Sequence, residues 1–503
     1  MYLTRTAFGS RTVFVITNTV RKERPVATSE VLPHAEAVAA PAGYRYRWFV
    51  MAAVIAADVM DLLDATVAQL AGPSIRRELG GGETTLQWIL AAYTLAFAVG
   101  LITSARLGDI LGRRPMFIVG MAGFTVASLA CGLAPTAGTL IAFRAIQGLF
   151  GATMIPQGLA MVKQSFPPQD LQKAFIPFGP IMGLSAVLGP ILAGFLIDAD
   201  ILGTGWRMIF LINVPVGIIG TTIAARYLPR VPREKGARLD PLGSLLVTVA
   251  CAGLIYPLVQ GRDLGWPTWT YALMGGALVV FALFAWSERR SDYPVIAPGL
   301  FRHRGFVAGL VFLGTFFVGM VGLGLVMNLF LQLGLGYTPM HAGVAQTPYA
   351  VGISIGAGLS GALLGPKLGR HVLHLGLAIA IVGMAWWGVT AGGLDHGASA
   401  WHLAGPFLVT GLGSGLIFAP LFDIILADLG DREVGSGSGL LNAAQQFCGA
   451  LGVAVLGTAY FHWLPGQGWS TATEWVAWVA LGCYAVSFLA AFLLPLKPRA
   501  DAL

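Results

Sequence analysis

Hydrophobic runs dominate the chain from Trp48 to Pro495. Each run has roughly the 20 residues that a helix needs to cross the hydrocarbon core of a bilayer, and short charged or Gly/Pro-rich segments separate the runs. The pattern predicts an all-α polytopic membrane protein with fourteen transmembrane helices. These cover residues 48–71, 86–107, 115–134, 138–162, 173–197, 206–228, 241–260, 269–287, 305–332, 340–365, 372–392, 400–427, 435–462 and 471–495.

Basic residues indicate how these helices are oriented. If both termini are cytosolic, the tails and inner loops carry most of the 31 Lys and Arg residues, as the positive-inside rule requires. We therefore expect a multi-pass protein of the inner (cytoplasmic) membrane, with a disordered cytosolic tail over residues 1–47 and a short one over 496–503. The net charge of +7 then reflects this topology and attraction to anionic membrane lipids, and we expect no nucleic-acid partner.

Composition excludes several functional classes. With 56% hydrophobic and 11% charged residues, the chain leaves no room for an enzymatic domain outside the bilayer, so we expect no enzyme. The GxxxxGK[ST] phosphate loop does not occur, which disfavours ATP-driven transport by this chain alone. The four cysteines lie within apolar runs without ligand spacing, so we expect neither a disulfide framework nor a metal site.

An internal repeat divides the chain. "ARLGDILGRR" at 105–114 matches "ALLGPKLGRH" at 362–371 in six of ten positions, and both copies fall in short predicted inner loops eight helices apart. This spacing predicts two six-helix bundles, 48–228 and 305–495, joined by a linker over 229–304 that adds two helices. Repeats of this kind are typical of secondary transporters, whose substrate cavity lies between the halves.

Three carboxylates interrupt the first predicted helix, at Asp58, Asp61 and Asp64. Their spacing of three spreads them over about 120° of one helix face, with Asp58 near mid-membrane and Asp64 nearer the outer side. Burial and mutual repulsion favour protonated carboxyl groups, as a proton-coupling site requires. A structural alternative remains, in which Asp64 only satisfies neighbouring polar groups.

Arg144 is the one basic residue well inside a predicted span. Its charge requires a partner in the membrane, either one of the acids or a set of carbonyls, and Gln147 one turn further on is placed to join the same network. A purely structural ion pair would also explain its presence.

The fifth predicted helix is rich in glycine and proline. Small residues at spacings of four let helices approach closely, and proline bends a helix, so this span predicts a pliable seam between the halves. Ordinary tight packing is the alternative. The residues concerned are Gly179, Pro180, Gly183, Gly189, Pro190 and Gly194.

Five motifs in order resemble the major facilitator superfamily, and within it the fourteen-span drug:proton antiporter family. They are "LLDATVAQLAGPSI", "ARLGDILGRRP", "FRAIQGLFGATMIP", "GPIMGLSAVLGPILAG" and "WRMIFLINVPVG". The first keeps the family's Asp64, Thr66, Pro73 and Ile75 but has Gln69 where Asn is usual. The resemblance covers the chain from about residue 48, and it implies a major-facilitator fold, a role for Arg144 in proton transfer, and an exporter motif in the fifth helix.

The second motif resembles the superfamily's loop signature, in which the resemblance implies a gating role for Gly108, Asp109, Gly112, Arg113 and Arg114. It further implies a latch in which Asp109 meets the N-terminus of predicted span 13, which begins "EVGSGSG". The alternative is that the arginines only anchor the topology. The second copy has Pro366 in place of Asp109, and this asymmetry favours the functional interpretation.

Polar and aromatic residues of several spans are candidates for substrate contacts, although each is also compatible with interhelical packing. With the acids, which favour cationic compounds, the candidate set is Asp58, Asp61, Gln69, Trp88, Tyr93, Gln147, Asn328, Gln332, Gln346, Asn442 and Gln445.

The sequence thus predicts a monomeric, proton-driven exporter of small amphipathic compounds, with Asp58, Asp61, Asp64 and Arg144 coupling export to proton entry and with no cofactor besides the proton gradient. An inward potential of about 100 mV supplies roughly 2.3 kcal/mol per proton. A same-fold transporter of a specific metabolite is one alternative, which pH-dependent efflux from loaded vesicles would separate. A non-transporting membrane sensor is another, and deletion of residues 1–43 would test it.

Overall fold

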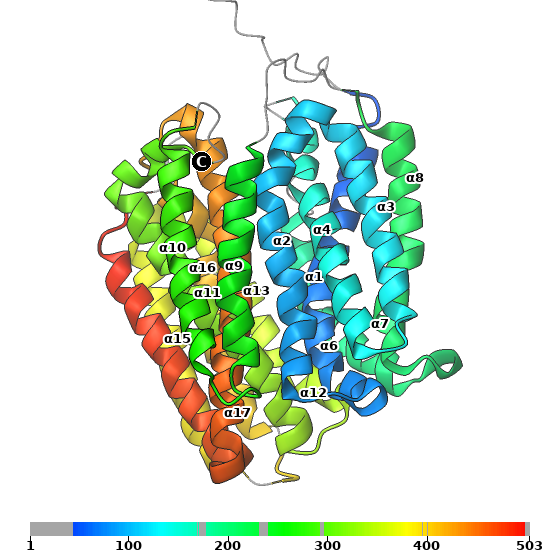
Figure 1. The fold of residues 1–503 in the computed structure, drawn as a ribbon, viewed down its shortest axis with the longest axis vertical. Coiled ribbons are helices and arrows are strands. Elements are labelled where there is room, and N and C mark those ends of the chain that lie inside the picture. Colours follow the sequence, from blue (N-terminus) through cyan, green and yellow to red (C-terminus); the bar gives the residue numbers. More distant parts are fainter. Residues whose placement is uncertain are drawn as a thin grey trace, which may run out of the picture. The chain divides into compact units, whose positions relative to one another are not determined.

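The computed structural model describes residues 44–167, 170, 178–230, 240–291, 296–394, 396–399 and 401–497. They belong to one compact unit, Ala40–Leu503. The described residues are mostly helical and include no strand (Figure 1). This confirms the all-α prediction. The predicted tails lie outside the described residues except for 44–47 and 496–497.

The helices follow the predicted hydrophobic runs. In the first part of the chain they are α1 (Arg47–Leu79), α2 (Glu83–Leu111), α3 (Arg113–Gly132), α4 (Ala137–Ser165), α6 (Phe178–Asp198), α7 (Met208–Leu211) and α8 (Asn213–Tyr227). An inserted pair follows, α9 (Pro241–Gln260) and α10 (Thr268–Glu288). The rest are α11 (Arg304–Leu329), α12 (Pro339–Ala345), α13 (Thr347–Leu359), α14 (Gly365–Leu368), α15 (His371–Gly392), α16 (Trp401–Ile425) and α17 (Asp431–Ala491).

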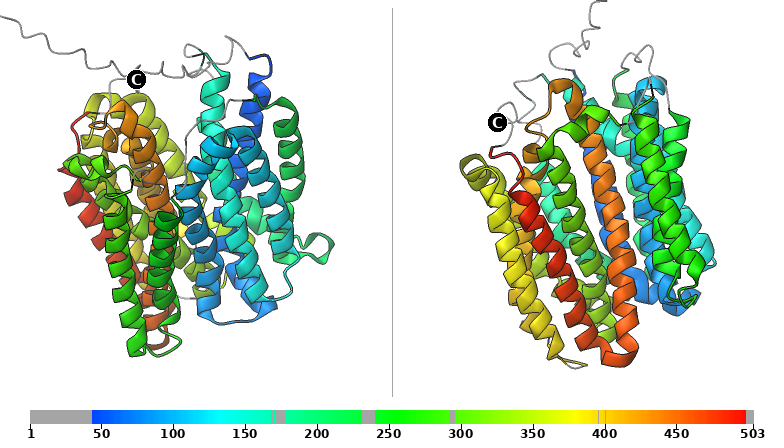
Figure 2. Two further views of the ribbon diagram at one scale, coloured as in Figure 1. Left: turned by 45° about the horizontal axis from the view of Figure 1, so that its top comes forward. Right: turned by 60° about the vertical axis from the view of Figure 1, so that its left-hand side comes forward.

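Local sequence explains several helix ends. Thr136 and Thr139 form a capping box at the start of α4, each hydroxyl accepting the other's backbone N–H at 3.2 Å. Gly112 separates α2 from α3 with a φ of 102°, a conformation that glycine adopts without strain. The last helix, α17, turns back at Gly468 (φ 77°, ψ 174°) into two antiparallel arms, which the right-hand view of Figure 2 shows in orange and red.

The candidate membrane spans are fewer than the fourteen predicted runs. Within the described residues, eleven segments are long and apolar enough to cross a bilayer, and one of them contains both arms of α17. Neither α1, which carries three Asp residues, nor α6 is among them. The count of fourteen therefore stays a prediction. The α1 helix also runs eight residues beyond the predicted end at residue 71, with Pro73 inside it.

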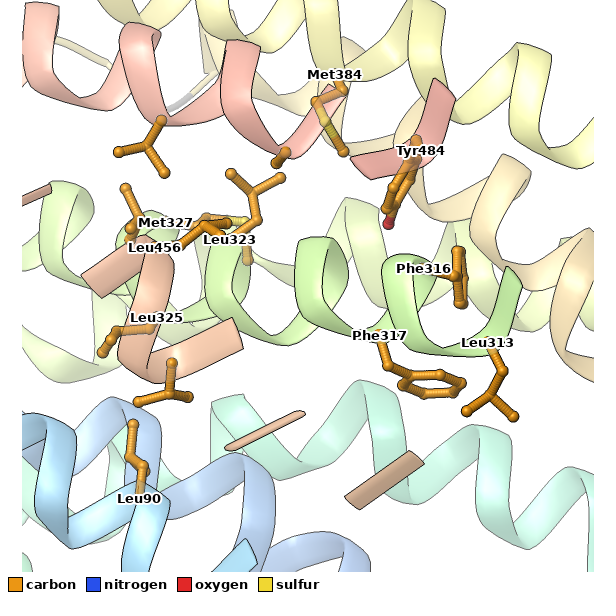
Figure 3. Close-up of a cluster of buried hydrophobic side chains, with 14 of the residues drawn as sticks. Leu90, Leu313, Phe316, Phe317, Leu323, Leu325, Met327, Met384, Leu456 and Tyr484 are labelled. Carbon is orange, nitrogen blue, oxygen red and sulfur yellow. The ribbon is translucent and has the colours of Figure 1, made fainter. Parts of the chain in front are cut away.

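Packing groups the helices into two halves. In the N-terminal half (α1–α8), α4 packs against α2 and α3, and α1 against α6 and α8. In the C-terminal half (α11–α17), α11 packs against α17, and α16 against α13 and α15. The inserted α9 contacts both α2 and α17. The largest buried apolar cluster spans the halves, since it includes Leu90 of α2 and Leu325 of α11 (Figure 3).

Candidate ligand-binding site

A buried ion pair joins the first and fourth helices of the N-terminal half. Arg144 of α4 donates to the carboxylate of Asp64 of α1, and each side chain is only 1% exposed. Gln147, one turn further along α4, accepts from Arg144 at 2.9 Å and donates to Asp64 at 2.9 Å. Arg144 also donates to the carbonyl of Ile89 at 3.3 Å. Both charges are thus enclosed by polar partners, as burial in an apolar bundle requires.

Tyr93 of α2 extends this network to a second carboxylate. The Arg144 guanidinium lies 4.2 Å from the centre of the Tyr93 ring, within cation–π range. The Tyr93 hydroxyl donates to the carboxylate of Asp61. A continuous path of side chains therefore leads from Asp61 through Tyr93 and Arg144 to Asp64.

The three acids of α1 have different surroundings. Asp64 is sealed against Arg144, whereas Asp61 lines a large cavity. Asp58 is half-buried and does not line the cavity, so it lies apart from the predicted cavity-facing stripe. Successive positions three apart differ by about 60° around the helix, which is enough to turn neighbouring acids toward different surroundings.

The cavity lies between the two halves and has a volume of about 1310 Å³. Its walls come from α1, α2, α4 and α6 on one side and from α11, α13, α15, α16 and α17 on the other. The predicted contacts that line it are Asp61, Gln69, Tyr93, Gln346 and Gln445, together with Arg144. Trp387 and Tyr484 also line it, and sequence reasoning missed both, because an aromatic residue inside an apolar run carries no signal that separates a cavity wall from packing.

The other predicted substrate contacts lie away from the cavity. Trp88 of α2 faces the inserted α9, where its indole donates to Gln260 at 3.4 Å. Asn442 is exposed and donates to the carbonyl of Ser438 in its own helix at 2.9 Å. Gln147 belongs to the ion-pair network described above. Helical periodicity predicts on which side of a helix these polar residues lie, but it does not predict which other helix packs against that side.

Asn328 and Gln332 of the C-terminal half fasten it to α1. Pro73 has no backbone N–H, so the carbonyl of Gln69, four residues earlier, lacks its helical partner. Asn328 donates to that carbonyl, and Gln332 donates to the carbonyl of Leu70 at 2.7 Å. The two amides also bond each other at 2.9 Å. This group, Pro73 with the carbonyls of 69 and 70 and the amides of 328 and 332, is called the proline fastener below.

Further contacts hold the halves together at the same end of the bundle, where α1 ends and α2 begins. Gln87 of α2 donates to the carbonyl of Val453 of α17 at 3.2 Å. Arg262, in the turn between α9 and α10, pairs with Glu83 of α2 and donates to the carbonyl of Phe461 of α17 at 2.8 Å. In this conformation the halves are closed at that end, and the cavity begins on the other side of the proline fastener.

The glycine- and proline-rich fifth helix forms part of this closure. A Cβ on Gly194 of α6 would lie 2.5 Å from the Cα of Met340, and the N-terminal end of α12 is bonded to α6 by Asp198, which accepts from the Met340 N–H at 3.0 Å. A Cβ on Gly189 would lie 2.9 Å from the Thr66 hydroxyl. Gly194 thus permits a close crossing between halves and Gly189 one within the N-terminal half. Pro190 lines the cavity, and Gly179, Pro180 and Gly183 lie in the first part of α6.

The loop motif is organised differently from the predicted latch. Asp109 accepts from Arg113 at 3.2 Å, and this ion pair lies within the motif itself. Arg114 donates to the carbonyl of Ala225 near the end of α8. At the start of α17, Ser436 accepts from the N–H of Ala297 at 3.1 Å. Within the described part of the chain, Asp109 in this conformation pairs with Arg113, four residues along the chain, and the latch with the N-terminus of α17 stays a prediction. A Cβ on Gly108 would overlap the Gln157 amide, so a larger residue there would displace that amide from its 2.9 Å bond to the Ser104 carbonyl.

A helical membrane protein whose two halves enclose a large central cavity, with a few polar and charged groups in its walls, has the architecture of a secondary transporter. Residues 54–453 match the Major Facilitator Superfamily, and the chain belongs to this family. It is a multi-pass membrane transporter and not an enzyme.

Relatives and solved structures agree with this assignment. The chain is 46% identical over 433 residues to the probable actinorhodin transporter of Streptomyces coelicolor, which covers 85% of this chain and 75% of that protein. It is 35% identical over 417 residues to the puromycin resistance protein pur8 of Streptomyces alboniger, covering 82% and 81%. The crystal structure of an autoinhibited POT family peptide transporter matches with a TM-score of 0.61 and 15% identity, over 88% of this chain and 95% of that one; this likeness concerns the fold alone.

Proposed function

We propose that this protein exports amphipathic organic compounds from the cell in exchange for protons, by alternating access of the central cavity. The observation that carries the proposal is the path from Asp61, on the cavity wall, through Tyr93 and Arg144 to the sealed Asp64. A ligand beside Asp61 and a proton on Asp61 alter the same charge network. Where the ligand is cationic, it and the proton neutralise the same carboxylate, so binding of either one opposes binding of the other, as antiport requires.

The cavity supports an amphipathic substrate. Its volume of about 1310 Å³ exceeds the several hundred Å³ of an ordinary small-molecule site. Among the described residues its charged wall members are Asp61 and Arg144 of the N-terminal half, while the opposite wall is uncharged and mostly apolar or aromatic, with amide groups at Gln346 and Gln445. The names of the two relatives, an antibiotic transporter and an antibiotic resistance protein, support export of antibiotic-like compounds.

The membrane orientation is part of the proposal. The bias of Lys and Arg toward one set of loops supports cytosolic termini in an inner membrane. In that orientation the closed end is the outer one, and the structure corresponds to a state closed to the outside. Protons would be the coupling ion, with no other cofactor, and a single chain would suffice because each half supplies one wall of the cavity.

The test uses the full chain in liposomes with an imposed pH gradient, with ethidium as the probe and an internal pH dye to follow protons. Asp61→Asn and Asp64→Asn are compared with wild type, and Asp200→Asn is the matched control, because Asp200 lies exposed in the turn after α6. We expect both network variants to lose ethidium-stimulated proton movement while the control keeps it. If both variants retain it, the coupling assignment is wrong. Ethidium accumulation in the opposite direction would favour an importer.

A further inference from the structure

Two adjacent amides of α17, Gln445 and Gln446, border the central cavity and are called the amide pair below. The next two residues fix the orientation of the helix at this point. The Phe447 ring packs against a phenylalanine of α10 with ring centres 6.0 Å apart, and the Cys448 sulfur lies 3.3 Å from where a Cβ on Gly314 of α11 would be. Because consecutive helical residues differ by 100°, the amide pair lies on the opposite face, toward the cavity.

The amide pair has unused hydrogen-bonding capacity. Both side chains are half-buried, and neither amide hydrogen-bonds another of the residues that the structure describes. Gln346, in the same cavity wall, instead donates to the carbonyl of Ala342 at 3.2 Å. A primary amide offers two N–H donors and a carbonyl acceptor. The pair therefore presents both donors and acceptors to a ligand.

The amide pair lies well inside the cavity. The carbonyl of Val453 accepts from Gln87 at the closed end of the bundle, and Gln446 precedes Val453 by seven residues in the same helix. Two helical turns at 1.5 Å per residue put the pair about 10 Å from that contact. A ligand at this depth displaces water from the amides, so it must supply equivalent hydrogen bonds or lose affinity.

Aromatic side chains of the same half line the cavity near the amide pair. Phe317 of α11 and Phe418 of α16 both border it, with ring centres 5.8 Å apart. A Cβ on Gly449 of α17 would lie 3.5 Å from the Val321 side chain of α11. Phe317 and Gln445 each precede these residues by four positions, and the two helices run in the same direction. The aromatic rings and the amides therefore lie at a similar depth.

We infer that the amide pair binds a neutral group of the substrate that both donates and accepts hydrogen bonds, a carboxamide or a hydroxyl, while Phe317 and Phe418 contact an adjoining aromatic ring. The inference rests on the proposed function, because it specifies the substrate class of the same cavity. A cationic group of a substrate would lie at Asp61, in the opposite half. Amides carry no charge, so the pair discriminates against analogues that lack the hydrogen-bonding group.

The experiment compares two near-isosteric neutral ligands, anthracene-9-carboxamide and 9-isopropylanthracene, by their fluorescence on binding to the purified full chain. The first carries an amide that donates and accepts, and the second has methyl groups in its place. Gln445→Met and Gln446→Met keep an unbranched side chain of similar length but remove the amide. Gln467→Met is the matched control, because Gln467 is exposed beside the turn at the far end of the same helix arm.

The quantity measured is the dissociation constant of the carboxamide divided by that of isopropylanthracene. We expect this ratio to rise about 2- to 10-fold for each amide that bonds the ligand, the value of one neutral hydrogen bond, and to keep its wild-type value in Gln467→Met. Both ligands are measured in every variant, so loss of folded protein cancels from the ratio.

The inference is overturned if the double variant Gln445→Met/Gln446→Met keeps the wild-type ratio, or if Gln467→Met raises it as much. Proton-driven ethidium transport by wild type together with an unchanged ratio would leave the exporter proposal standing and reject the role of the amide pair. A raised ratio in a protein that moves no probe with protons would support the amide pair as a ligand site and reject antiport.

Discussion

The buried pair of Asp64 and Arg144 predicts that removing both charges destabilises the protein less than removing Asp64 alone. Asp64→Asn leaves the Arg144 charge unpaired in a site where both side chains are 1% exposed. Breaking a buried ion pair by removing one partner costs about 3–5 kcal/mol. Gln147, the Ile89 carbonyl and the Tyr93 ring remain around the guanidinium, so we expect a value near the lower end, about 3 kcal/mol.

Arg144→Gln should lower the free energy of unfolding less than Asp64→Asn does. In Arg144→Gln the remaining Asp64 carboxylate can take up a proton and become neutral, whereas an arginine cannot release one. The double variant Asp64→Asn/Arg144→Gln removes both charges and leaves amides that can bond each other and Gln147. We therefore expect its free energy of unfolding to be closer to wild type than that of Asp64→Asn, even though it transports nothing.

The assay is unfolding of the purified full chain by SDS in mixed micelles, with transport of ethidium measured in parallel. Asp200→Asn again serves as the control for loss of an exposed carboxylate. Additive losses, with the double variant less stable than either single one, would refute the reasoning. So would an Asp64→Asn variant as stable as wild type, because the pair would then be hydrated.

Three further predictions concern the closed end of the bundle. Asn328→Ala leaves the Gln69 carbonyl without its partner, so it should favour opening of that end. In a background without the four native cysteines, a Gln69→Cys reporter should then react faster with a membrane-impermeant maleimide. An unchanged reaction rate would contradict this prediction. Gly194→Val should abolish transport, because even a Cβ there would lie 2.5 Å from Met340, whereas Gly275→Val, with nothing within 4 Å, should transport normally; equal activities would exclude the crossing as a constraint. Arg262→Ala breaks the pair with Glu83 and the bond to Phe461, so hydrogen exchange of the α9–α10 turn should accelerate, and unchanged protection there would argue against a closing role.

Much of this architecture could be predicted because it follows from composition and local periodicity. Hydrophobic runs predicted the helices, and a lone arginine in such a run required a buried partner. The structure supplies it at Asp64. The roles of Asn328 and Gln332 could not be predicted, since a polar residue on a helix does not reveal which carbonyl of a distant helix it faces.

Two other features depended on information that a single sequence does not contain. The end of α1 was predicted too early because the prediction ended the helix where the apolar run ends. The helix continues beyond that run, through Pro73 to Leu79. The place of Trp387 in the cavity wall became visible only in the structure.

The proline fastener separates two demands on one residue. The side chain of Gln69 lines the cavity, while its carbonyl joins the two halves. Because the carbonyl belongs to every amino acid, position 69 can change its side chain, and with it the shape of the ligand site, without losing the bond to Asn328. Pro73, which releases that carbonyl, carries the constraint instead. A transporter built in this way can acquire new substrates by substitution at the cavity wall and still close.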